Sequence, residues 1–176
     1  MAAAVETAAA RQVTDVGEQL AGKYLTFLLS AEEYGIEILK VQEIIQMQKV
    51  TRVPKAPNFI RGVINLRGKV IPVVELRKKF DMEQQDDTEK TCIIVVMIES
   101  AGQPVTMGII IDEVKEVLDI EAVNIEETPS FGASINTEFI MGIGKVGDNV
   151  KMLLDIDKVL STGEIEILQH ASQAQA

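Results

Sequence analysis

Short apolar runs alternate with turn residues along most of this chain, and the clearest pair of runs lies within residues 59–80. Residues 63–66 and 70–74 are rich in valine and isoleucine, and a glycine-containing turn at residues 67–69 separates them. Two β-branched runs joined by such a turn predict a β-hairpin. Proline cannot donate a ladder hydrogen bond, so Pro72 predicts that the second strand is an edge strand or carries a bulge there.

The hairpin pattern returns 80 positions further along the chain, at residues 139–160. The shift places Phe59 on Phe139 without a gap, and conservative pairs continue in step. Residues 34–45 match residues 107–118 in the same order along the chain. Two matches in one order indicate a duplicated unit of about 75 residues, so the sequence predicts two similar lobes.

Further apolar runs predict strands in both halves of the chain, at residues 24–29, 34–38, 91–98 and 104–111. The run at 91–98 is apolar almost throughout, which is typical of a strand buried on both faces. Residues 39–47 combine helical spacing with a β-branched composition, and we expect a short helix or turn that leads into a strand. Because nearly all the runs are short and β-branched, the predicted fold class is mainly β, with two five-stranded barrel-like lobes and short helices.

Changes in composition along the chain indicate where the lobes begin and end. Residues 1–21 lack periodicity and are expected to form a flexible N-terminal tail. The first lobe is expected at 22–85, the second at 86–163, and a C-terminal helix or tail at 164–176, with the acidic segment 81–90 as the joint between lobes. Duplicated neighbours can exchange a strand or a terminal segment, so the spatial boundary is left open.

The composition is that of a folded protein. Apolar residues make up 47% of the 176 positions, which argues against disorder. The alanine-rich start has no basic region and is interrupted by Glu6, so it is a poor signal peptide. No stretch approaches the ~20 apolar residues of a transmembrane helix, and the single Cys92 cannot form an internal disulfide. We therefore expect a cytoplasmic protein with no direct membrane insertion.

The charge is acidic overall and unevenly distributed. The net charge of −10 argues against general binding to nucleic acid or to anionic membranes. Residues 49–80 contain nine basic side chains and one acid, Glu75, so this segment carries +8 and the remainder −18. We hypothesise that this basic region, with Arg61 and Arg67, supports docking of an acidic partner surface. The alternative is a solvated basic edge.

The chain is poor in the groups that carry chemistry. His170, the only histidine, lies near a polar C-terminus, and Cys92 lies in an apolar run where a core position is expected. There are too few cysteines and histidines for a zinc site, and the glycines at 142–147 lie in a hairpin rather than at the start of a helix. No catalytic residue, cofactor, metal or small-molecule ligand is expected. A small enzyme with Glu43 and Asp112 between the lobes is the alternative from another class.

Three side chains are candidates for binding on residue type and position. Arg67 lies at the hairpin turn, where a guanidinium can hold a carboxylate through two hydrogen bonds. Glu43 lies among Val41 and other apolar residues and is either the polar edge of a strand or an interface acid. Phe131 lies in a loop of glycine, serine and proline, and it either folds back or projects as a contact anchor.

The segments YGIEILKVQEI at 34–44, TRVPKAPNFIRGVINLRGKVIPVVELRKKF at 51–80 and EFIMGIGKVGDNVKMLLDIDKVL at 138–160 resemble the CheW-type chemotaxis coupling proteins. The resemblance runs in order from about residue 24 to residue 160. It implies two SH3-like, five-stranded β-barrel lobes. It also implies a non-catalytic adaptor that joins the cytoplasmic tip of methyl-accepting chemoreceptors to the regulatory domain of the chemotaxis histidine kinase, in arrays at the membrane.

The resemblance also points to individual residues. Those that match positions associated with receptor or kinase contacts are Val41, Glu43, Gly62, Asn65, Leu66, Arg67 and Gly68. Phe131 is a candidate for a second contact with the kinase. Gly62 and Gly68 have a second explanation, because turn geometry alone can require glycine. A CheW-like scaffold that serves a non-chemotactic phosphorelay would have the same sequence features, and only its partners would distinguish the two.

Overall fold

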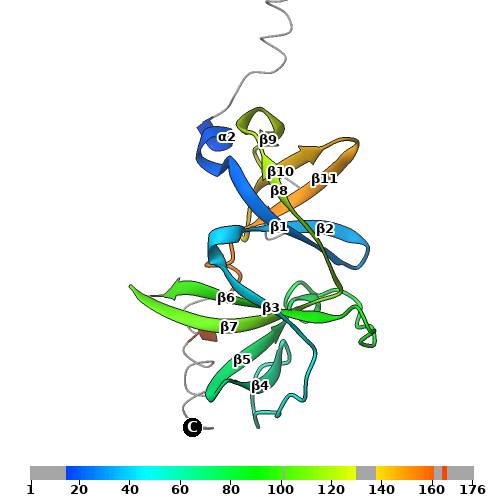
Figure 1. Cartoon of the computed structure of the whole chain (residues 1–176), viewed down its shortest axis with the longest axis vertical. Helices are drawn as coiled ribbons and strands as arrows, with labels where there is room; N and C mark the ends of the chain where they lie inside the picture. The colour runs from blue at the N-terminus through cyan, green and yellow to red at the C-terminus, as the bar shows by residue number, and fades with distance from the viewer. Residues whose placement is uncertain (1–14, 101, 130–137, 161–163, 166–176) are drawn as a thin grey trace, which may run out of the picture.

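The computed structural model describes residues 15–100, 102–129, 138–160 and 164–165, and its strands form two sheets stacked along the long axis (Figure 1). Sheet B, drawn below, contains β3 (Val41–Gln46), β4 (Ile60–Leu66), β5 (Lys69–Glu75), β6 (Cys92–Ser100) and β7 (Gln103–Ile111), in the order β3-β6-β7-β5-β4. Sheet A contains β1 (Gly22–Leu29), β2 (Glu32–Glu37), β8 (Glu113–Ile120), β9 (Ile125–Glu126), β10 (Ile140–Val146) and β11 (Asn149–Leu154), in the order β8-β1-β2-β11-β10-β9.

The helices whose bounds the structure describes are short, and they are α2 (Asp15–Leu20), η1 (Ile38–Lys40), α3 (Leu76–Lys79) and η2 (Ala122–Asn124). The helical turn η1 leads directly into β3, as the mixed pattern of residues 39–47 predicts. The prediction of a mainly β fold with two units and short helices is confirmed. Nothing in the strand order contradicts an SH3-like barrel for each unit.

Each sheet takes strands from both copies of the repeat. The first hairpin, β1-β2, pairs with β8 and β11, and the later hairpin, β6-β7, pairs with β3 and β5. The chain therefore crosses between the sheets twice, from β2 to β3 and from β7 to β8. The acidic segment 81–90, expected as the joint between lobes, connects α3 to β6 within one sheet. The two copies have exchanged their first hairpins.

The strand register repeats the sequence match residue for residue. Val63 pairs with Pro72 in the first copy, and Ile143 pairs with Met152 in the second, 80 positions later. Both ladders shift register at the equivalent point, next to Gly62 or Gly142. The duplication read from the sequence is therefore present in the hydrogen-bonded framework, not only in the apolar pattern.

The prediction that the strand of Pro72 is an edge strand or carries a bulge at the proline is wrong in both alternatives. Strand β5 is interior to sheet B, between β4 and β7. The parallel pairing of β5 with β7 begins at Val73, the residue after the proline. The bulge lies on the neighbouring strand, where Arg61 is the extra residue between Ile60 and Gly62. The sheet accommodates the proline because Pro72 lies just before the residues that pair with β7.

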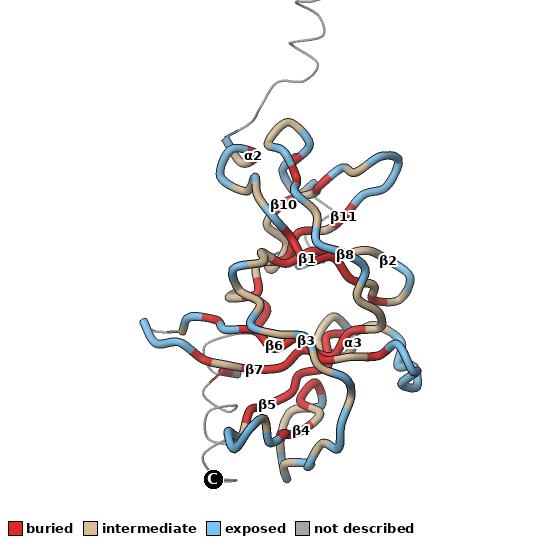
Figure 2. Tube along the Cα trace, viewed as in Figure 1, coloured by how far each residue is buried: buried red, intermediate tan, exposed pale blue. Residues whose placement is uncertain are grey.

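The largest apolar cluster lies between the sheets and contains residues of both (Figure 2). Sheet A contributes Phe27 and Ile36, and sheet B contributes Ile94 and Met107, all with 0% of their surface exposed. Burial of one such side chain stabilises a fold by about 1.5–3 kcal/mol. A smaller cluster lies in each unit, around Tyr24 in sheet A and around Ile71 and other residues in sheet B. The shared cluster makes the two units one folded body.

The expectation of a tail over residues 1–21 is wrong for its last part, because Asp15–Leu20 forms α2. Leu20 packs against the small apolar cluster of sheet A, and its carbonyl accepts a hydrogen bond from the Tyr24 hydroxyl. The helix approaches η2 so closely that a Cβ atom on Gly17 would lie 2.3 Å from the Ala122 oxygen. Residues 1–14 lie outside the described residues, as does most of the expected C-terminal helix or tail.

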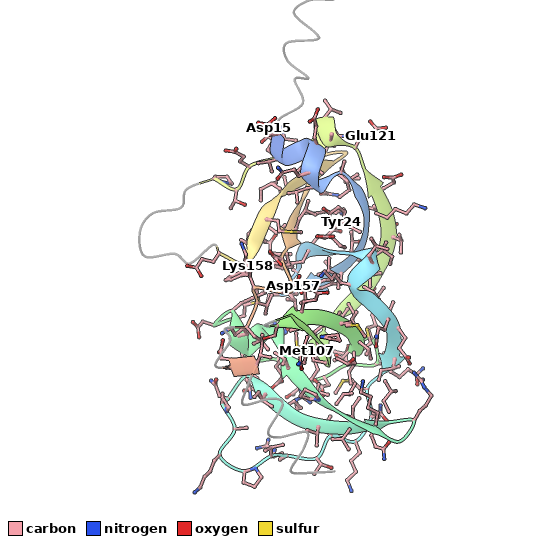
Figure 3. All side chains as sticks on the ribbon, turned by 90° about the vertical axis from the view of Figure 1, so that its left-hand side faces the viewer. Asp15, Tyr24, Met107, Glu121, Asp157 and Lys158 are labelled. Atoms are coloured by element: carbon pink, nitrogen blue, oxygen red, sulfur yellow. The ribbon has the colours of Figure 1, made fainter. Side chains whose placement is uncertain are left out.

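An ion pair lies at each of the two crossings between the sheets, and the crossing segment contributes the acid at one and the base at the other. At the β7–β8 crossing, Arg77 from α3 pairs with Asp112, and Asp112 also accepts a hydrogen bond of 2.8 Å from the backbone of Ser30. At the β2–β3 crossing, Lys40 pairs with Asp157 at 2.8 Å, and Figure 3 shows Asp157 where the two units meet. Asp157 is 80 positions after Arg77, so the two copies place opposite charges at this equivalent position.

Candidate protein-binding site

The hairpin turn between β4 and β5 presents Arg67 to solvent. Leu66 and Lys69 are the last paired residues, so the loop contains two residues, Arg67 and Gly68. Their φ angles are +51° and +87°, the pattern of a type I′ turn, which matches the twist of the strands and favours glycine. The Asn65 side chain accepts a hydrogen bond of 2.8 Å from the Gly68 backbone. Asn65 and Gly68 therefore shape the turn that carries the arginine.

Arg67 forms a two-point ion pair with Glu43, which lies on β3. Nη1 of Arg67 donates to Oε1 of Glu43 at 3.0 Å, and Nη2 donates to Oε2. Because β3 and β4 are the two edge strands of sheet B, the pair joins the two edges of the sheet. The Arg67 side chain is 70% exposed and the Glu43 side chain 29%. A partner protein can therefore reach the guanidinium while Glu43 fixes its orientation.

The ion pair shifts the titration of both groups. The hydrogen bond from Arg67 lowers the pKa of Glu43 below its ordinary value, and the same contact raises the pKa of Arg67. A lowered carboxyl pKa means that the ionised form is the favoured form, so the pair is complete at neutral pH and is lost only as the pH falls through the lowered value.

Other side chains extend this surface across the end of sheet B. Met97 on β6 lies two residues from Val95, the partner of Glu43, so Met97 and Glu43 are on the same face of the sheet. Met97 pairs with Thr106, and the Thr106 hydroxyl lies 3.3 Å from the Lys69 ammonium. We call the surface formed by Glu43, Arg67, Lys69, Met97 and Thr106 the turn face. Met97 is 37% exposed, within a run that the sequence predicts to be buried on both sides.

Sequence reasoning does not single out Met97, Thr106 or Lys69 as site residues. Because methionine is apolar, the sequence pattern does not distinguish an exposed Met97 from the buried residues of the same strand. Thr106 and Lys69 join the site only through the strand pairing of β6 with β7 and the position of the turn.

The other sequence candidates have structural roles. Val41 is half-buried and packs against the shared core, and Leu66 packs against the apolar cluster inside sheet B. Gly62 is buried at the bulge, and a Cβ atom there would lie 2.1 Å from the Thr51 oxygen. The close approach of two backbones therefore explains this glycine without any partner. Phe131 lies outside the described residues.

The basic segment is largely neutralised within the molecule. Five of its nine basic residues form ion pairs, namely Arg61, Arg67, Arg77, Lys78 and Lys79. In the described part of the chain, the other four form none, and they are Lys49, Arg52, Lys55 and Lys69. The charge available to a partner is therefore smaller than +8 and lies mostly in residues 49–55.

The two carboxylates considered for catalysis each form an ion pair with an arginine. Glu43 is paired with Arg67 and Asp112 with Arg77, so each lies beside its own guanidinium. Burial raises the pKa of the Cys92 thiol, which disfavours the reactive thiolate. No group of histidine, cysteine, aspartate or glutamate among the described residues could hold a metal ion. The described helices are all too short or too polar to cross a membrane.

The chain matches known proteins over nearly the whole of its described length. The family model of the CheW-like domain matches residues 23–164. The chain belongs to the CheW-like domain family. The matched residues of this CheW-like domain extend from β1 into the segment after β11 and include both sheets.

Several members of the CheW-like family are similar over most of their length. The chain is 40% identical over 158 residues to the chemotaxis protein CheW of Klebsiella aerogenes, covering 90% of this chain and 93% of that relative. It is 34% identical over 139 residues to the chemotaxis protein CheW of Bacillus subtilis, covering 78% and 86%. The crystal structure of the scaffolding protein TtCheW from Thermoanaerobacter tengcongensis has a TM-score of 0.73 and 35% identity, over 82% of this chain and 97% of that one. The resemblance read from the hairpin motifs is confirmed.

Proposed function

We propose that this chain is a non-catalytic adaptor that joins the cytoplasmic tip of chemoreceptors to the regulatory domain of the chemotaxis histidine kinase. The family match over residues 23–164 carries the proposal, since the similar proteins are named for chemotaxis and for scaffolding. The adaptor works in the cytoplasm and is recruited to receptor arrays at the membrane. It binds neither nucleic acid nor a small-molecule ligand.

The turn face is the proposed contact with one of these partners. Its guanidinium is exposed and held in place, so binding does not have to order a long side chain. Met97 supplies an apolar contact next to the charged pair. Such a surface needs no chemistry of its own, because it transmits a signal if it binds one conformation of a partner more tightly than another. Phe131 is proposed to contribute to a second contact with the kinase.

A pull-down experiment tests the adaptor role. The receptor cytoplasmic fragment is immobilised, and retention of the purified kinase is measured with and without this chain. We expect retention that depends on the chain and that Arg67→Glu reduces, with Phe131→Ala as a separate variant for the second contact. Circular dichroism first shows that each variant is folded. If the folded wild type retained no kinase and bound neither protein alone, the proposed function would be wrong.

A further inference from the structure

Two hollows of the surface meet at Arg61, at the opposite end of β4 from the turn face. Their volumes are about 430 Å³ and about 570 Å³, and Arg52, Arg61 and Asp87 line both. Arg67 is six positions after Arg61 along the strand and turn, which corresponds to about 20 Å. This second surface is therefore distinct from the turn face, and a role for it does not depend on the proposed function.

A buried carboxylate holds Arg61 from the inside. Arg61 is the extra residue of the bulge on β4, and bulges redirect side chains. Its Nη2 donates to Oε1 of Glu75 at 2.6 Å, and Glu75 is only 8% exposed. Lys78 also contacts Glu75, at 3.1 Å. A buried carboxylate needs such partners, so the Arg61–Glu75 pair belongs to the fold.

A second and more exposed carboxylate, that of Asp87, occupies the outer edge of the same guanidinium. Nη1 and Nη2 of Arg61 donate to its two oxygens at 2.9 and 3.1 Å. The Asp87 side chain is 38% exposed, and residues 82–88 form neither helix nor strand. Partly exposed ion pairs stabilise a fold only weakly, so an external carboxylate can replace Asp87 without disturbing the sheet.

Basic side chains without an ion-pair partner lie around this position. Arg52 lines both hollows and Lys49 lines the second, and both side chains are exposed. Neither forms an ion pair with any residue that the structure describes. Together with Arg61 they form a basic row along the connector between β3 and β4, while the molecule as a whole carries −10.

We propose that this row is a docking site for an acidic, extended segment of a partner protein. One carboxylate side chain of that segment takes the place of Asp87 on the Arg61 guanidinium, and neighbouring acids bind Arg52 and Lys49. The two-oxygen geometry that Asp87 has is the geometry the incoming carboxylate adopts. Asp87 is thus an internal competitor for the incoming carboxylate.

The test uses the full chain and two short labelled peptides. One alternates Glu and Ser, and the other has Gln in place of every Glu. Binding is measured by fluorescence anisotropy at low and at high salt. The Glu peptide is expected to bind more tightly than the Gln peptide and to weaken with salt. Asp87→Asn should raise its affinity about fivefold, because it removes the competitor. Arg52→Gln should lower it about threefold.

Asp86→Asn is the matched control, because it makes the same change in charge next to Asp87 but touches no ion pair among the described residues. If Asp87→Asn raises the affinity for the Glu peptide and Asp86→Asn does not, the docking site is supported. Equal effects of the two variants, or no effect of Asp87→Asn, would overturn it. Inorganic phosphate that competed as well as the Glu peptide at equal ionic strength would indicate a small-anion site instead and also overturn it. These variants leave the buried Glu75 and its partners in place, so misfolding does not obscure the result.

Discussion

The two hairpins of the repeat share a strand register but end in different turns. The first turn contains Arg67 and Gly68, both with positive φ. The second contains Gly147 with φ of +60° and Asp148, the pattern of a type II′ turn. Both turns join two strands equally well. The fold therefore requires a two-residue turn at this point, but it does not require an arginine.

The partner of Arg67 shows the same contrast. Glu43 corresponds to Glu116, 73 positions later, but the position that corresponds to Arg67 is Gly147. The β1–β8 ladder shifts register opposite Glu116, between Leu25 and Phe27. There the Thr26 hydroxyl donates to the Glu116 carbonyl at 2.8 Å and accepts from the Glu116 amide at 3.2 Å. In the second copy the contact of Glu116 thus lies within one strand pair, whereas in the first copy the ion pair of Glu43 joins the two edge strands of sheet B. The difference supports the proposal that the turn face serves binding rather than folding.

Among equivalent substitutions in the two copies, we expect the largest difference in stability at the glycine beside each bulge. Gly62 has φ of +151° and a Cβ atom there would lie 2.1 Å from the Thr51 oxygen, whereas at Gly142 the nearest atom is the Glu126 oxygen at 2.9 Å. Gly62→Ala should therefore lower the free energy of unfolding by about 3 kcal/mol, and Gly142→Ala by about 1 kcal/mol. Urea unfolding of both variants measures this. Equal losses of stability would mean that the backbone accommodates a Cβ atom equally well at the two glycines, contrary to this prediction.

The second largest difference in stability is expected between substitutions at the two crossings between the sheets. The Arg77 side chain is 12% exposed and also donates to Ser30 and to the Glu83 carbonyl, while the Lys40–Asp157 pair is about 30% exposed. Arg77→Gln should destabilise the fold by about 2 kcal/mol, because it leaves Asp112 without its cation. Lys40→Gln should cost no more than about 0.5 kcal/mol. Thermal unfolding compares the two, and a greater loss with Lys40→Gln would reverse the ranking.

A smaller effect is expected at the cap of the first turn. Asn65→Ala removes the hydrogen bond to the Gly68 backbone and should lower the free energy of unfolding by about 1 kcal/mol. The second turn has Lys145 at the equivalent position, so Lys145→Ala is the control and should change stability by less than about 0.5 kcal/mol. Chemical denaturation at one pH distinguishes these. A loss with Lys145→Ala as large as with Asn65→Ala would show that the cap has no special role.

The Glu43–Arg67 pair itself predicts a pH dependence. Because Arg67 lowers the Glu43 pKa, the pair is present above the ordinary glutamate pKa of about 4.3 and is lost as the pH falls through the lowered value. Carboxyl ¹³C NMR should give a Glu43 midpoint below that ordinary value in the wild type. In Arg67→Gln the midpoint should rise toward it. An unchanged midpoint in Arg67→Gln would mean that the ion pair does not form in solution.

The sequence predicts the strands and the repeat because both depend on local apolar pattern and on spacing. It leaves an exchange between the copies open but does not identify β1-β2 and β6-β7 as the exchanged segments, because the two hairpins are similar enough to pair with either copy. It does not predict helix α2 either, because the contacts of α2 with η2 are tertiary rather than periodic.

Within the candidate site, sequence reasoning names Glu43 and Arg67 but does not pair them. They are 24 positions apart and meet only because they lie on the two edge strands of one curved sheet. Gly62 has the opposite outcome, since a residue proposed as a contact is explained by the close approach of the Thr51 backbone. A glycine beside a predicted bulge is a signal that favours the structural explanation.

The most direct test of the turn face is the affinity of Arg67→Glu for each partner, measured separately by calorimetry with the receptor fragment and with the kinase regulatory domain. Lys145→Glu makes the same change in charge at the second hairpin and is the matched control. We predict that Arg67→Glu weakens binding to at least one partner by about tenfold or more, while Lys145→Glu leaves both affinities within about twofold. Wild-type affinity of a folded Arg67→Glu variant for both partners would contradict the account.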